Sequence, residues 1–218
     1  MSIEKQVQGL LRELGQDIHL VVAAKNRTPA EVMECIHAGA RIIGENYLQD
    51  AERAYQVIGT GPILHFIGRL QRKKIKKIVQ LFDMVQTLDN LEMASIINRE
   101  CFSLDKTMPV LVEVNSGKEV QKTGVMPEEA EGFIKQVSDF EHLKVMGLMT
   151  MGPLLADPEE YRPYFRLTRQ IFEKIRALRM KGVQMDYLSM GMTDSYRVAI
   201  EEGANMVRIG SKIFGPRV

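Results

Sequence analysis

Cysteine is scarce in this sequence of 218 residues, which holds only Cys35 and Cys101. Neither cysteine has the spacing of a metal site or a redox motif, so a reducing compartment is indicated. No apolar run approaches the length that spans a bilayer. The first residues, Met1 to Lys5, are charged and lead into an amphipathic pattern, unlike a signal peptide. We therefore expect a cytoplasmic protein that has no membrane partner.

A strong charge of either sign is also missing, because 29 lysines and arginines face 28 acidic residues. A net charge of +1 gives no support for a nucleic-acid partner. The histidines and cysteines form no cluster with ligand spacing, so no metal site is expected. The most basic stretch, residues 69–77, lacks interleaved aromatic residues. A solvated helix face is its ordinary interpretation, and any further role stays open.

Short apolar strands and amphipathic helices alternate along the chain after an N-terminal helix at 3–14. The predicted strands lie at about 18–25, 41–46, 63–68, 84–88, 109–114, 145–150, 185–189 and 206–209. The helices between them include one that Pro29 opens, one at 90–102, one from Pro127, one at 158–180 and a short one that ends near Glu202. Such alternation predicts a parallel sheet of the α/β class.

Eight strand–helix units match a compact (β/α)8 TIM barrel. We predict a single TIM-barrel domain over residues 1–218 with an extra N-terminal helix. A doubly wound open sheet is the competing fold, but it usually has fewer strands. Its glycine-rich dinucleotide fingerprint is also absent after the first predicted strand.

Lys25 ends the first predicted strand, after five apolar residues and before the break at Asn26–Pro29. In a TIM barrel the carboxyl ends of the strands form the active face. Burial there would lower the pKa of a lysine, and a neutral amine can form a Schiff base with a carbonyl compound. The alternative is a lysine whose ammonium group extends to solvent from the strand end.

The loops after the seventh and eighth strands have the composition of an anion site. Ser189 to Thr193 is small, bears hydroxyl groups and contains a glycine, and a helix is expected just after it. Gly210 and Ser211 follow the eighth strand. Loops at these two places form the usual phosphate site of this fold. A pair of plain turns is the alternative.

Arg208 lies within the eighth strand between the apolar residues Val207 and Ile209. A buried guanidinium needs a carboxylate, carbonyl groups or an aromatic nitrogen as its partner. A salt bridge to Glu113 or Glu45 is one interpretation, and contact with a bound ring is the other. A lysine beside a phosphate site suggests either pyridoxal 5'-phosphate (PLP) or the sugar phosphate of a class I aldolase.

At this point the chain resembles a known family, the YggS/PROSC family of PLP homeostasis proteins. The matching segments are Val22-Ala-Ala-Lys25, Gly44-Glu-Asn-Tyr47, His65-Phe-Ile-Gly68, Gly147-Leu-Met-Thr150, Leu188-Ser-Met-Gly-Met192, Val207-Arg-Ile-Gly210 and Ile213-Phe-Gly215. Leu64 stands where the family commonly has tryptophan, and Thr193 where it has serine. The lysine, the arginine and the loops are all retained.

The resemblance implies a barrel like the N-terminal domain of alanine racemase, with PLP as the cofactor. It implies a Schiff base on Lys25 and a set of further cofactor-binding residues: Asn46 beside the cofactor, Ser189, Met190, Gly210 and Ser211 at the phosphate, and Arg208 at the pyridine nitrogen. No catalytic residue is implied. The expected function is PLP homeostasis and delivery, with effects on amino-acid and keto-acid balance and without robust catalysis.

Two enzymatic alternatives remain open. A PLP-dependent amino-acid racemase of this fold would add a second domain, which we do not expect after strand eight. A class I aldolase would pair its lysine with a carboxylate or a second lysine, and no convincing pair is found. As partners the resemblance implies PLP itself and PLP-dependent enzymes that lack their cofactor, and we expect a monomer.

Overall fold

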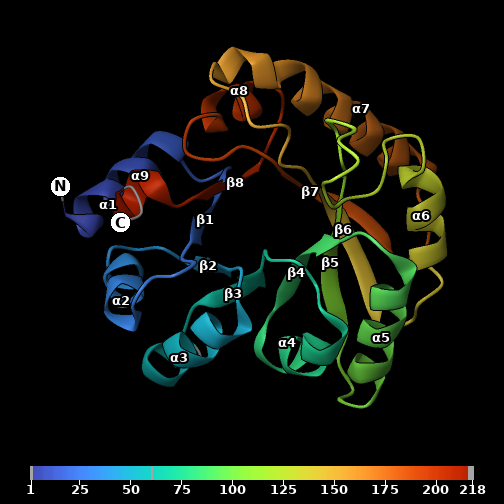
Figure 1. The fold of residues 1–218 in the computed structure, drawn as a ribbon, viewed down its shortest axis with the longest axis horizontal. Coiled ribbons are helices and arrows are strands. Elements are labelled where there is room, and N and C mark those ends of the chain that lie inside the picture. Colours follow the sequence, from blue (N-terminus) through green and yellow to red (C-terminus); the bar gives the residue numbers. More distant parts are fainter. Residues whose placement is uncertain (1, 60, 216–218) are drawn as a thin grey trace.

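Eight parallel strands form a closed barrel in the computed structural model, which describes residues 2–59 and 61–215 (Figure 1). They pair in chain order, and β8 pairs with β1 to close the ring. The strands are β1 (His19–Ala23), β2 (Ile42–Glu45), β3 (Ile63–Phe66), β4 (Met84–Leu88), β5 (Met108–Glu113), β6 (Leu143–Met149), β7 (Val183–Ser189) and β8 (Met206–Ile209). The predicted TIM barrel is confirmed.

Helices surround the barrel on its outside (Figure 1). They are α1 (Ile3–Leu14), α2 (Pro29–His37), α3 (Leu48–Ile58), α4 (Ile75–Leu81), α5 (Leu91–Phe102), α6 (Ala130–Val137), α7 (Arg162–Leu178), α8 (Tyr196–Glu201) and α9 (Ser211–Phe214). The extra N-terminal helix is α1, and it lies beside α9. No helix in the described part of the chain is both long and apolar enough to cross a membrane.

Local sequence signals explain where several helices begin. Thr28 and Glu31 form a capping box at the start of α2, and Pro29 occupies the first turn, where its missing N–H costs nothing. The side chain of Asn90 accepts a hydrogen bond from the backbone N–H of Met93 at 2.9 Å and so caps α5. These caps fix the loops that leave β1 and β4 at the carboxyl end of the barrel.

Several predicted boundaries were wrong by a few residues. β1 ends at Ala23, so Lys25 lies in the turn after the strand. The helix expected from Pro127 begins at Ala130, and residues 158–161 form a 3-10 turn before α7. Residues 72–74 of the basic stretch are also a 3-10 turn, before α4. The last strand is followed by the short helix α9, which was not predicted.

The strands of the barrel are buried on both faces, so apolar side chains pack in two layers. One layer lies inside the ring, and the other lies between the strands and the helices. Inside the ring, six buried residues form one cluster: Val21, Ile42, Met84, Leu111, Met149 and Met206. A much larger cluster fills the space between the strands and the helices, where the Phe66 and Phe82 rings meet edge to face at 5.2 Å. The outer layer provides most of the buried apolar area and so most of the stability.

Substitution of Phe165 on α7 tests how much the outer apolar layer contributes to the free energy of unfolding. The Phe165 side chain is fully buried and stacks on Tyr161 at 5.7 Å. We expect Phe165→Ala to lower the free energy of unfolding by about 3–5 kcal/mol, because it leaves a cavity that the helices cannot close. The matched control, Phe102→Ala, changes a ring that is 70% exposed and should cost less than about 1 kcal/mol. Equal losses in denaturant titrations would contradict the assignment of the core.

Candidate functional site

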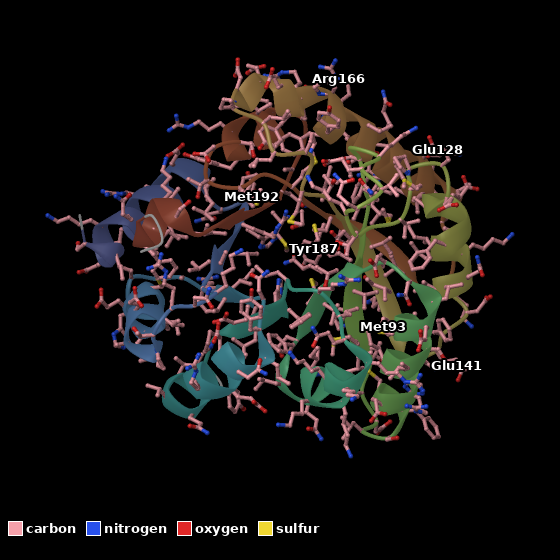
Figure 2. The ribbon with its side chains drawn as sticks, in the orientation of Figure 1. Met93, Glu128, Glu141, Arg166, Tyr187 and Met192 are labelled. Atoms are coloured by element: carbon pink, nitrogen blue, oxygen red, sulfur yellow. The ribbon has the colours of Figure 1, made fainter. Side chains whose placement is uncertain are left out.

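A cavity of about 220 Å³ opens at the carboxyl ends of the strands, the face where TIM barrels place their active sites. Met192, one of its walls, lies near β8 at the edge of the ring of strands (Figure 2). The lining residues come from β1 and β8 themselves and from the segments after six strands, β1, β2, β3, β6, β7 and β8: Ala23, Lys25, Asn46, Ile67, Met151, Met192, Thr193, Asp194, Arg208, Gly210 and Ser211. Five of the seven predicted site residues are therefore brought together.

Two larger hollows lie elsewhere. One, of about 710 Å³, lies between α5 and α6, and no lysine or arginine lines it. The other, of about 660 Å³, lies at the amino end of the barrel near Arg12, His19 and Arg41. Only the smaller cavity combines a lysine, a buried arginine and hydroxyl groups at the carboxyl end of the strands. The side chains that line the smaller cavity, rather than its volume, therefore mark it as the candidate site.

Lys25 is half-buried, two residues beyond the end of β1. The strand pairing continues up to it, because the Ala24 N–H donates to the Gly44 carbonyl at 2.9 Å. The next residue, Asn26, has a left-handed backbone with φ of 59°, and its N–H donates to a carboxylate oxygen of Asp50 at 2.9 Å. The main chain on both sides of Lys25 is thus held by hydrogen bonds.

Asn46 faces the same cavity from the turn after β2. Its side-chain amide donates to the Ile67 carbonyl at 3.4 Å, which ties the turn to the end of β3. Gly68 makes this possible, because a Cβ atom at that position would lie 2.0 Å from the Asn46 carbonyl oxygen. A glycine is therefore required where the chain leaves β3.

Hydroxyl groups line the cavity between β7 and β8. The Ser211 Oγ donates to Thr193 Oγ1 at 2.9 Å, and the Lys212 N–H donates to the same oxygen at 3.3 Å. Gly210 lies close to β1, since a Cβ atom there would be 3.0 Å from the Ala23 carbonyl oxygen. Thr193 was missed as a site residue, although it closes the segment in which we predicted an anion site.

Ser189 and Met190, both predicted to contact a phosphate, do not line this cavity. Both are fully buried. Ser189 lies two residues after Tyr187 on β7, so both side chains point to the same face of the strand, and the Tyr187 ring packs inside the barrel. The Ser189 hydroxyl forms hydrogen bonds with Gln86 and Arg208. Met190 packs in the outer layer, and its N–H donates to the Met206 carbonyl at 3.1 Å. Their predicted contact with a phosphate stays a prediction that the lining of this cavity does not support.

Arg208 forms the floor of the cavity and is only 5% exposed. Its Nη1 donates to the Ser189 carbonyl at 2.9 Å and to the Ser189 hydroxyl at 2.8 Å, and its Nη2 donates to the Thr150 carbonyl at 2.9 Å. Burial lowers its pKa to about 10, so the guanidinium stays charged at neutral pH. Within the described residues its hydrogen-bond partners are carbonyl and hydroxyl oxygens. The charge of Glu113 acts on it from a distance and raises its pKa, but neither Glu113 nor Glu45 forms the alternative salt bridge.

Glu45 is a buried carboxyl group behind the site, 1% exposed, and neither of its oxygens has a hydrogen-bond partner. Burial, and then the nearby negative charge of Asp50, raise its pKa to about 8. Glu45 is therefore protonated at neutral pH. Asp50 remains the acceptor for Asn26 and also pairs with Arg53 at 2.5 Å.

His65, Cys35 and Cys101, the other residues that could carry chemistry, are buried in the fold. His65 is buried inside the barrel, where desolvation lowers its pKa to about 3. Burial raises the pKa of both thiols, to about 12 for Cys35 and about 11 for Cys101, so neither is a thiolate nucleophile. Among the described residues no three histidine, cysteine or acidic side chains are grouped as metal ligands.

Comparison with known sequences places these features in context. The sequence profile of the alanine racemase N-terminal domain matches residues 3–218. A pyridoxal phosphate homeostasis protein of Aquifex aeolicus is 37% identical over 199 residues, which cover 91% of this chain and 86% of the relative. Its counterpart in Escherichia coli K12 is 34% identical over 206 residues, which cover 93% and 87%.

Comparison with solved structures finds the same fold in proteins that are similar to this chain. PipY of Synechococcus elongatus without PLP superposes with a TM-score of 0.92 at 26% identity and covers 98% of this chain and 100% of its own. PipY with PLP bound gives a TM-score of 0.90 at 25% identity, with the same coverage. Alanine racemase of Clostridium difficile gives 0.86 at 16% identity; the match covers 99% of this chain and 57% of the racemase, and it shows the fold alone.

The buried Glu45 gives a prediction about stability and pH. Its pKa is about 8 in the folded protein, whereas the ordinary pKa of a glutamate is 4.5, so the native state binds more protons between these values. Stability must therefore fall as pH rises through this window. Glu45→Gln imitates the protonated form and should be more stable than wild type at pH 8.5, by on the order of 2–4 kcal/mol, but not at pH 4.

Denaturant titrations from pH 4 to 9 measure this effect. Glu34→Gln is the control, because Glu34 lies exposed on α2. The control should follow the wild-type curve. A Glu45→Gln curve parallel to that of wild type across the whole range would contradict the assignment.

Proposed function

The chain belongs to the alanine racemase N-terminal domain family and, within it, to the PLP homeostasis proteins, and from this premise we propose that it binds PLP as a Schiff base on Lys25. The observation that carries the proposal is that Lys25 and Arg208 line one cavity at the carboxyl end of the barrel. PipY, which shares this fold over its whole length, has been solved with PLP bound.

The residues of the cavity fit the three functional parts of PLP. Lys25 offers an amine to the aldehyde. Thr193 and Ser211 offer hydroxyl groups, and Gly210 an uncrowded backbone, to the phosphate. Asn46 lies on the other side of Lys25, and Met151, Met192 and Ile67 supply apolar walls for a ring. Thr193 enters this assignment in place of Ser189 and Met190.

The Schiff base forms when the neutral amine of Lys25 attacks the aldehyde carbon. The carbonyl oxygen leaves as water together with both amine protons, so no further reactant is needed. Bound PLP supplies an electron-withdrawing ring. Arg208 uses three of its five N–H donors in the bonds to Ser189 and Thr150, which leaves donors for the pyridine nitrogen. Because the guanidinium keeps its own protons, it leaves that nitrogen unprotonated and weakens the ring as an electron sink.

A weakened electron sink suits a protein that holds PLP rather than one that transforms amino acids. We therefore propose a role in PLP homeostasis and delivery, with indirect effects on amino-acid and keto-acid balance. PLP-dependent enzymes that lack their cofactor are the proposed recipients. The proposal further includes a cytoplasmic location and a monomeric state. Sedimentation of the purified protein tests the monomeric state. An amino-acid racemase is the second candidate, because the sequence profile of the alanine racemase N-terminal domain matches residues 3–218.

Lys25→Ala tests the Schiff base. Purified wild-type protein incubated with PLP should be yellow and should retain about one PLP per chain after borohydride reduction, because reduction makes the lysine–PLP bond permanent. Lys25→Ala should retain none. Lys174→Ala is the matched control, since Lys174 is exposed on α7 and pairs with Glu131. Mass spectrometry of the reduced chains makes the comparison, and a wild-type chain that traps no PLP would refute the proposal.

A chiral assay separates the two candidate functions. PLP-loaded protein incubated with L-alanine should form no more D-alanine than PLP alone, because Arg208 weakens the ring as an electron sink. Sustained turnover that disappears in Lys25→Ala would reject the non-catalytic role and favour the racemase. Lys174→Ala serves again as the control for a loss of folded protein.

A further inference from the structure

A line of four buried polar side chains crosses the interior of the barrel beneath the cavity. Arg208 Nη1 donates to Ser189 Oγ at 2.8 Å, Ser189 Oγ donates to Gln86 Oε1 at 2.8 Å, and Gln86 Nε2 lies 2.8 Å from His65 Nδ1. The four residues come from β8, β7, β4 and β3, and each is at most 5% exposed. Only Arg208 reaches the cavity.

The direction of every bond in this line is fixed by its first member. A guanidinium can only donate, so the Ser189 oxygen accepts from Arg208. The single hydroxyl proton of Ser189 is then directed to Gln86 Oε1. The Gln86 amide nitrogen can only donate, so His65 Nδ1 accepts and the proton of a neutral His65 lies on Nε2.

A second contact confirms which way the Gln86 amide is turned. Gln86 Nε2 also donates to the sulfur of Met206 at 3.3 Å. In the flipped amide an oxygen would face that sulfur, and Ser189 would receive two donors and have no acceptor for its own proton. The observed orientation satisfies the Gln86 oxygen and both hydrogens of its amide nitrogen, which is what a polar group inside a barrel requires.

We propose that Gln86 is a positioning residue that acts through Ser189 to hold the guanidinium of Arg208 in place at the cavity floor, and that His65 holds Gln86. This rests on the proposed function, because the effect is read through PLP bound above Arg208. Gln86 does not line the cavity, and its printed side-chain partners are Ser189, His65 and Met206, so we assign its influence on bound PLP to the line. Neither Gln86 nor His65 follows a strand end, where site residues of this fold are sought.

The hydrogen-bond line can be tested in protein without PLP. Nitrogen-15 NMR of His65 at neutral pH should show an unprotonated Nδ1 and a protonated Nε2 in wild type. In Gln86→Leu the Nδ1 loses its donor and the two tautomers should mix. In Gln86→Glu the new carboxylate still accepts from Ser189 but cannot donate, so a proton should move to Nδ1. A wild-type His65 with a protonated Nδ1 would overturn the proposed direction.

The positioning effect is tested with PLP. Gln86→Leu should raise the Kd for PLP about five- to tenfold and shift the absorbance band of the bound cofactor, because a hydrogen bond to a charged group is lost or weakened. Gln86→Glu keeps an acceptor for Ser189 and should stay within about twofold of wild type. Thr168→Val on α7 is the matched control, since it removes a buried hydroxyl bond to Tyr164 far from the line.

The controls separate the possible failures. Gln86→Leu with wild-type Kd and absorbance would overturn the positioning role, as would an equal change in Thr168→Val. Wild-type protein that traps no PLP on Lys25 would refute the proposed function before any variant is made. The His65 spectrum would then still decide whether the line exists as described.

Discussion

Burial of the Arg208 guanidinium without a carboxylate partner is the constraint on which the site depends. Removing a cation from water costs several kcal/mol, and neutral acceptors must offset that cost. The carbonyls of Ser189 and Thr150 and the hydroxyl of Ser189 provide them. A hydroxyl that accepts from a cation must in turn donate, which is why Gln86 and His65 occupy positions that other barrels fill with branched apolar residues.

The interior of the barrel therefore holds two kinds of contact. Val21, Ile42 and Leu111 pack there against methionines. The line from Arg208 to His65 runs among these apolar residues, since Arg208 pairs with Val21 in the strand register and Ser189 pairs with Met206. Lys25 is held differently, by a backbone bond from Asn26 to Asp50 on α3. Arg208 is thus held by hydrogen bonds inside the barrel, and the turn that carries Lys25 is held by a hydrogen bond to α3 outside it. Both residues line the same cavity.

The sequence predicted the eight strands and their order well, because strands buried on both faces read as short apolar runs with breaks after them. Five predicted site residues line the cavity. Lys25, Asn46, Gly210 and Ser211 could be selected because they follow such runs, and Arg208 because it is a charged residue within one. Ser189 and Met190 do not line the cavity. The side chain of Ser189 points into the barrel, and Met190 packs outward. The partners of Arg208 lie on other strands, and the register that unites them is not visible in one sequence.

The titratable groups around the cavity bear on whether PLP bound there would racemise amino acids. Racemisation needs a base that removes a proton on one face of the substrate and an acid that returns one on the other. In the described part of the chain the titratable side chains that line the cavity are Lys25, Arg208 and Asp194. Arg208 keeps its protons. Lys25 would be released when an amino acid displaces it from PLP, and its amine would then be free to act on one face. The group for the other face would have to be Asp194, which lies on an exposed turn.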